Sequence, residues 1–179
     1  MPEYILTVDE NDNVIGTEEK MKCHDGDGIL HRAFTLMIKN NKGEFLITKR
    51  SDKKRLWPGI WDGSISSHVH KGESYEDAAR RRLPDELGVK SNKVDFLFKI
   101  RYQTRYKDVG SENEIDAFLI VDGIDEVFPR EEEISDYKFL SLEELNEDIE
   151  KNPKNYAPWF LIIWNKFISM ESNKTFTKD

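Results

Sequence analysis

The sequence has little cysteine, no long hydrophobic run and no excess of positive charge. Its single cysteine, Cys23, excludes an internal disulfide framework and suits a reducing compartment. The longest apolar run, PWFLIIW at residues 158–164, is far shorter than the ~20 residues of a membrane span, and the amino terminus has no apolar signal core. The net charge of -8 argues against a general nucleic-acid-binding surface. We therefore expect a cytoplasmic protein with no membrane or nucleic-acid partner.

The hydrophobic residues that are present come in periodic blocks. Helices are expected at residues 74–88, 141–149 and 159–170, the first two opening on a capping serine. No repeat or linker is visible, so one domain over residues 1–170 is expected, of the mixed α/β (α+β) class, with a frayed polar tail over 171–179. Strands are expected at residues 3–8, 14–16, 33–39, 44–49, 94–106, 115–121 and 138–140.

Histidines and paired carboxylates are the groups that could bind a metal. The sequence has four histidines, His24, His31, His68 and His70. In Glu112-Asn113-Glu114, both carboxylates point to one side of an extended chain, which is costly unless a cation lies between them or one is protonated. An exposed strand end is the alternative explanation. Three histidines beside this pair would form a nitrogen–oxygen site suited to Mn²⁺, Fe²⁺ or Zn²⁺; spacing alone does not show that these groups converge.

The segment GESYEDAARRRLPDELGV, residues 72–89, is the most specific pattern. On its predicted helix, Arg82 and Glu86 are four residues apart and share a face. They form either a surface ion pair or an arginine for a phosphate beside a carboxylate for Mg²⁺.

This segment resembles the Nudix box, a loop–helix element that binds metal-complexed diphosphates. A Nudix hydrolase expects glutamate where this chain has Arg82, which damages a hydrolytic metal cluster. The run Arg-Arg-Leu-x-x-Glu-Leu-Gly instead resembles type I isopentenyl diphosphate isomerases. The resemblance spans residues 4–170 and includes the segments Glu19-Lys20, Leu30-His31, Lys49-Arg50, Trp57-Pro58-Gly59-Ile60-Trp61, Gly72-Glu73-Ser74, Arg101-Tyr102, Glu112-Asn113-Glu114 and Pro158-Trp159.

The resemblance implies a Nudix α/β/α sandwich and an enzyme that interconverts isopentenyl and dimethylallyl diphosphate. It implies that one Mn²⁺, Zn²⁺ or Fe²⁺ is bound by His24, His31, His68, Glu112 and Glu114, and that Glu86 holds the Mg²⁺ of the diphosphate. The diphosphate oxygens would be neutralised by Lys20, Arg50, Lys54 and Arg82. Trp159 would lie over the reacting carbons, and Tyr102 would bind Glu114, which supplies protons on one side. His70 matches no functional position and is expected to be a solvated strand residue.

The segment SISSHVH, residues 64–70, contains the main departure from the isomerase pattern. Alternation places Ser66, His68 and His70 on one strand face. The family has a cysteine where this chain has Ser66, so a hydroxyl replaces the acid–base thiol that normally faces Glu114. Cys23 is no substitute, because it points away from the face of His24.

Three hypotheses therefore stay open. The chain is an isomerase in which Ser66 takes part in proton transfer, a Nudix hydrolase of a nucleotide or prenyl diphosphate, or a catalytically silent diphosphate-binding protein. The sequence leaves the oligomeric state undetermined.

Overall fold

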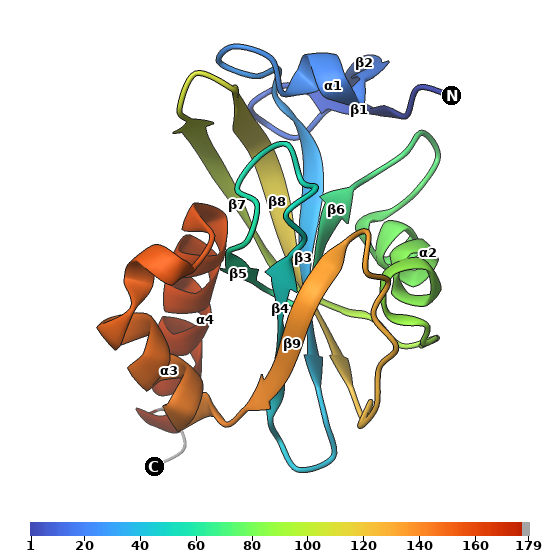
Figure 1. Cartoon of the computed structure of the whole chain (residues 1–179). Helices are drawn as coiled ribbons and strands as arrows, with labels where there is room; N and C mark the ends of the chain where they lie inside the picture. The colour runs from blue at the N-terminus through green and yellow to red at the C-terminus, as the bar shows by residue number, and fades with distance from the viewer. Residues whose placement is uncertain (177–179) are drawn as a thin grey trace.

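The fold is a mixed sheet with helices packed on both faces, as the resemblance implied (Figure 1). The computed structural model describes the backbone of residues 1–176 and side chains through residue 173. One apolar core lies between the sheet and helix α2 (Tyr75–Leu87), and a second lies between the opposite face and helices α3 (Leu142–Lys151) and α4 (Pro158–Phe176). Among the helices of the described chain, none has both the length and the apolar character needed to cross a membrane.

The centre of the sheet is a parallel pair of strands, β3 and β8. Strand β3 also pairs antiparallel with β1, β4 and β6, and β8 pairs antiparallel with β7. Strand β2 extends the sheet beyond β1, while β5 and β9 both pair with β4. The strands are β1 (Tyr4–Val8), β2 (Val14–Glu19), β3 (His31–Lys39), β4 (Phe45–Arg50), β5 (Trp61–Asp62), β6 (Ile65–His68), β7 (Asp95–Tyr106), β8 (Gly110–Asp122) and β9 (Ile134–Leu140).

The helix ends follow the local signals in the sequence. Ser74 accepts a hydrogen bond from the backbone of Asp77 at 3.0 Å, and Asp77 accepts one in return, which forms a capping box for α2. Gly88 ends the same helix at a φ of 65°, a conformation that favours glycine. Ser141 and Glu144 cap α3 in the same way, as expected. A short α1 (Lys20–Cys23) and a 3-10 turn (Pro153–Asn155) complete the helical elements of residues 1–176.

Among the boundaries that differ from the sequence expectation, three bear on the expected site and tail. Strand β8 begins at Gly110 instead of residue 115, so the paired carboxylates lie inside a strand and the exposed-end explanation is wrong. Helix α4 continues to Phe176, so its expected end at residue 170 and the frayed tail over 171–176 are wrong; residues 177–179 of that tail lie outside the described residues. Strand β6 ends at His68, so His70 is not a strand residue.

The alternation along β8 explains where the polar site forms. Ala117, Leu119 and Val121 face the α2 core, whereas Phe118 and Ile120 face the α4 core. Glu112, Glu114 and Asp116 are in step with Phe118 and therefore lie on the α4 face of the strand. The same strand face is thus acidic at its start and apolar at its end, and the acidic half is where the candidate site lies.

Candidate active site

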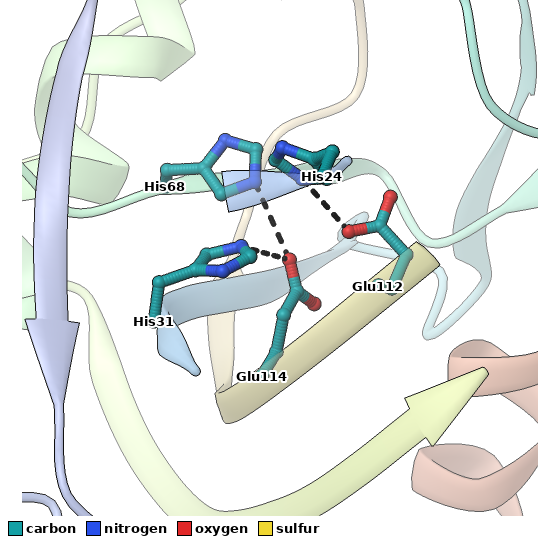
Figure 2. A group of neighbouring side chains, drawn as sticks. All are labelled: His24, His31, His68, Glu112 and Glu114. Carbon is teal, nitrogen blue, oxygen red and sulfur yellow. Dashed lines mark hydrogen bonds and ion pairs between the residues drawn. The ribbon is translucent and has the colours of Figure 1, made fainter. Parts of the chain in front are cut away.

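Strand register brings the metal-binding candidates together. His31 on β3 and Tyr102 on β7 are both direct neighbours of Glu114 on β8, and His68 on β6 is the neighbour of Ala33. His24 follows the last residue of α1. The ligand atoms of the three histidines, Glu112 and Glu114 all lie within 4.8 Å of one another, and Figure 2 shows the five side chains turned toward one centre.

The geometry of this His/Glu cluster, which comprises His24, His31, His68, Glu112 and Glu114, fits a divalent metal. His31 Nε2 and His68 Nε2 lie 3.1 Å and 3.3 Å from the same oxygen of Glu114. The Nδ1 atoms of His24 and His31 lie 2.6 Å and 2.7 Å from backbone carbonyl oxygens, which favours protonation there and leaves Nε2 free to bind a metal. Glu112 Oε2 is 2.9 Å from His24 Nε2 but has no hydrogen-bond partner of good geometry among the described residues. A cation between these atoms would satisfy them.

Burial and the neighbouring charges perturb the cluster. Burial would raise the pKa of Glu114, but the hydrogen bond and charge of His31 outweigh it and lower the pKa below its usual value. Burial, followed by the charges of Lys20 and His24, lowers the pKa of His68 well below its usual value. The carboxylate is thus held as an anion and the imidazole as a neutral base, the protonation states in which both bind metals.

A glycine allows the His24 segment to approach β8. The backbone N–H of Ser111 donates to the carbonyl oxygen of His24 at 3.0 Å. A Cβ atom at Gly110 would overlap that same carbonyl oxygen. Only glycine therefore lets the start of β8 pack this closely against the loop that carries His24.

A cavity of about 370 Å³ opens beside the cluster. All four cations expected to bind diphosphate line it, namely Lys20, Arg50, Lys54 and Arg82, together with Glu86. Ser66, Tyr102 and Trp159 line the same cavity, as do His24, His68, Glu112 and Glu114. His31 is fully buried behind this surface and contacts it through Glu114.

The cations of the cavity are already paired with carboxylates. Lys20 Nζ lies 2.9 Å from Glu3, and Arg82 donates to Glu86 at 2.8 Å. Lys54 is ion-paired with Glu133, on the loop before β9. Burial would raise the pKa of Glu133, but Lys54 outweighs it and lowers the pKa to about 2. An incoming diphosphate would compete with these side-chain carboxylates for the same donors.

One wall of the cavity is aromatic, and the guanidinium carbon of Arg50 lies over it, 5.2 Å from the centroid of the Trp159 ring. The indole of Trp159, at the start of α4, lies 6.2 Å from the ring of Tyr102 and 5.3 Å from the ring of Trp57. The Tyr102 hydroxyl donates to Glu114, as the resemblance implied. Burial and then the charge of Glu114 raise the pKa of Tyr102 well above its usual value, so the phenol keeps its proton.

Comparisons with known proteins identify the family of this chain. Residues 29–160 match the family model of the NUDIX domain. Isopentenyl-diphosphate Delta-isomerase 1 of Photorhabdus laumondii is 35% identical to this chain over 173 residues, which cover 96% of this chain and 98% of that protein. This chain belongs to the isopentenyl-diphosphate isomerase branch of the Nudix family. Isopentenyl-diphosphate Delta-isomerase 1 of Mus musculus is 34% identical, over 94% of this chain and 83% of that protein.

The fold comparison supports the same family. A crystallised protein of Deinococcus radiodurans superposes on this Nudix chain with a TM-score of 0.67 at 22% identity, covering 83% of this chain and 90% of that one. At this identity the likeness concerns the fold alone.

The expectation for His70 is wrong, whereas the exclusion of Cys23 agrees with the structure. The His70 side chain is 32% exposed and its Nε2 lies 3.0 Å from Glu3 Oε1, so it contacts Glu3 and is not a solvated strand residue. Cys23 is buried, and its burial raises the pKa of the thiol to about 11, in agreement with its exclusion as an acid–base group.

Three acidic residues near the isomerase-family site were missed from the sequence. Asp62 is buried behind Arg50 and Trp159, Asp116 lines the cavity, and Glu133 is ion-paired with Lys54. Asp116 gave a detectable signal, because an acid within the otherwise apolar run of residues 115–121 requires a partner or a proton. Asp62 lies at the end of a predicted loop and Glu133 in an acidic run at residues 131–133, and neither context gives such a signal.

Proposed function

We propose that this protein interconverts isopentenyl and dimethylallyl diphosphate. Curated proteins of that name match the chain over most of its length. The observation that carries the proposal is one cavity in which a cationic seat, a His/Glu cluster and an aromatic wall meet. Moving a double bond within a five-carbon diphosphate needs these three parts together.

The cationic seat would bind the diphosphate. Lys20, Arg50, Lys54 and Arg82 supply the charge, and Glu86 is placed to hold the Mg²⁺ that accompanies a diphosphate. Glu86 is buried, and its burial raises its pKa in spite of Arg82. Release of Arg82 to the substrate would leave this carboxylate free for the cation.

The His/Glu cluster would act on the proton at one face of the substrate. Bound there, Mn²⁺, Zn²⁺ or Fe²⁺ would act as a Lewis acid that sets the acidity of the coordinated carboxyl group. Glu114 is the group of this chain that holds and moves the proton, and the Tyr102 hydroxyl orients it. His24, His31 and His68 would fix the cluster, and the burial of His24 and His31 keeps water from its inner side.

The aromatic wall would stabilise the charge that develops when the double bond is protonated. The carbon skeleton then resembles a tertiary carbocation, and a cation over a desolvated tryptophan face gains ~2 kcal/mol. Trp159 is 2% exposed and lines the cavity, so its ring is a suitable face. Ser66 lies on the cavity wall and would exchange the second proton.

One experiment separates this activity from its alternatives. Purified protein is incubated with isopentenyl diphosphate and Mg²⁺ in D₂O, and the products are read by NMR and by a phosphate assay. Deuterium in dimethylallyl and isopentenyl diphosphate is the expected result. Release of phosphate or a monophosphate, from these substrates or from nucleotide diphosphates, would indicate a hydrolase, and binding without either product a silent diphosphate-binding protein.

A further inference from the structure

Asp62 is a buried carboxylate that contacts three of the residues facing the substrate cavity. It is 2% exposed and lies at the end of β5, behind the cavity wall. The Trp159 indole N–H lies 3.0 Å from Oδ1 and 3.2 Å from Oδ2, and Arg50 Nη1 lies 3.5 Å from Oδ2. The backbone N–H of Gly63 donates to Oδ1 at 2.7 Å. Burying a carboxylate is costly unless it is paired and hydrogen-bonded, and a buried titratable group beside a cavity is a candidate functional residue.

The third contact is Ser66, the residue at the position of the family's thiol. Its hydroxyl interacts with the Asp62 carboxylate and stabilises the charged form. On the other side, Ser66 Oγ lies 3.3 Å from Thr35 Oγ1, and Thr35 donates to Asp116 at 3.0 Å. Because the only hydroxyl proton of Thr35 is used on Asp116, Ser66 keeps its own proton for Thr35 or Asp62.

We propose that Asp62 is the proton partner of Ser66 and replaces the acid–base thiol of the family. This rests on the proposed isomerase function. Ser66 Oγ removes a proton from the substrate carbon as its own O–H proton passes to Asp62. The C–H bond and the Ser66 O–H bond break, while a new Ser66 O–H and an Asp62 O–H form, and the freed electron pair becomes the double bond. Ser66 stays neutral, and the reverse direction returns the proton by the same route.

This arrangement compensates for the low acidity of a serine hydroxyl. Ser66 has only to relay the proton, and a carboxyl group stores it. Burial raises the pKa of Asp62 to about 6, against the opposing effects of Arg50 on β4, Gly63, Ser66 on β6 and Trp159 on α4. Asp116 on β8 also faces Asp62 and repels a second negative charge. A group with a pKa near 6 gains and releases protons readily near neutral pH.

The contact between Asp62 and Ser66 is tested first without turnover. In protein labelled with [¹³C]aspartate, the Asp62 carboxyl resonance is identified by its loss in Asp62→Asn, and its midpoint is followed by NMR. We expect a midpoint near 6 that rises in Ser66→Ala, because the hydroxyl stabilises the charged carboxylate. A midpoint unchanged by Ser66→Ala would overturn the proposal, whatever the activity of the protein.

The catalytic role is tested by a double-mutant cycle on the isomerase reaction. Asp62→Asn should lower kcat by about 10²- to 10⁴-fold with little change in KM, and should remove an acidic limb near pH 6 from the rate profile. In a Ser66→Cys background, where the thiol itself holds the proton, the same change should cost less than about tenfold. An equal cost in both backgrounds would mean that Asp62 only maintains the structure, which refutes the proposal. Wild-type protein that incorporates no deuterium would refute the proposed function instead.

Discussion

Ser66 is the residue at which this chain departs most clearly from the isomerase pattern. It lines the cavity at the position where the resemblance implies a thiol, and a serine hydroxyl is a far weaker acid than a thiol with a pKa of ~8.5. We therefore expect Ser66→Cys to raise the isomerisation rate at least about tenfold, measured as the initial rate of dimethylallyl diphosphate formation. Ser135→Cys is the matched control, because it adds an exposed thiol on β9, at a position that does not line the cavity. No gain in Ser66→Cys, or an equal gain in both variants, would contradict the assigned role of position 66.

The raised pKa of Asp62 predicts how the free energy of unfolding depends on pH. Its folded-state pKa of about 6 lies above the ordinary 3.8, so its contribution to stability is fully present below pH 3.8 and is lost as the pH rises through 6. The loss is about 3 kcal/mol, because ionisation of a buried carboxyl opposes folding. Asn cannot ionise, so Asp62→Asn should gain about this much relative to wild type between pH 4 and 7. Urea unfolding at both pH values measures the difference, and an unchanged difference would contradict the buried, titrating carboxyl.

At the scale of elements, the start of β8 sets the position of His24. The loop after α1 packs on β8 without a side chain between them, because position 110 is glycine. Gly110→Ala should push the His24 carbonyl away and weaken Mn²⁺ or Zn²⁺ binding by about 10- to 100-fold, the usual effect of disturbing a group that orients a ligand. Isothermal titration calorimetry measures the affinity.

The control for this substitution is Gly16→Ala. Gly16 lies in β2, where an added Cβ meets only Thr7 Oγ1 at 3.5 Å, an ordinary contact. Metal affinity in Gly16→Ala should match wild type. If Gly110→Ala binds metal as tightly as Gly16→Ala does, the packing of the loop on β8 does not position His24.

For the whole molecule, the His/Glu cluster connects α1, β3, β6 and β8 at one point. Metal at 1,000 times its Kd should stabilise the fold by about 4 kcal/mol, which raises Tm by about 8–16 °C for a chain of this size. Thermal unfolding with Mn²⁺ or Zn²⁺, and then with a chelator, measures the shift. His24→Ala should lose the response, whereas His70→Ala should keep it, because His70 pairs with Glu3 outside the cluster. A full shift in His24→Ala would place the metal elsewhere.

The fold and most of the cavity lining could be predicted from the sequence, but some residues gave a clear local signal and others gave none. Capping serines and glycines marked the ends of α2 because these signals are local. Glu112 and Glu114 gave no sign of burial, since two acids in a row of polar residues are typical of an exposed strand end, and only register with His31 and Tyr102 places them inside. Convergence of the histidines came from the family resemblance and not from spacing.

Contacts between residues far apart in the sequence could not be predicted. Asp62 acquires its significance from Trp159, which lies 97 residues away in the sequence and meets it only when α4 docks beside β4 and β5. The backbone N–H of Ala157 donates to the Trp61 carbonyl at 2.8 Å and fixes this docking. A single sequence contains no pattern that predicts such a contact.

X-ray absorption spectroscopy of zinc-loaded protein tests the shared metal site most directly. The central claim is that three imidazoles and two carboxylates share one ion beside the cationic seat. The spectrum should then show a single zinc environment with imidazole scattering from about three histidines and with oxygen ligands at ~2.0–2.2 Å. His31→Ala, which removes the one ligand buried behind the cavity, should lower the imidazole contribution by one. A zinc environment without histidine scattering, or one unchanged in His31→Ala, would contradict the account.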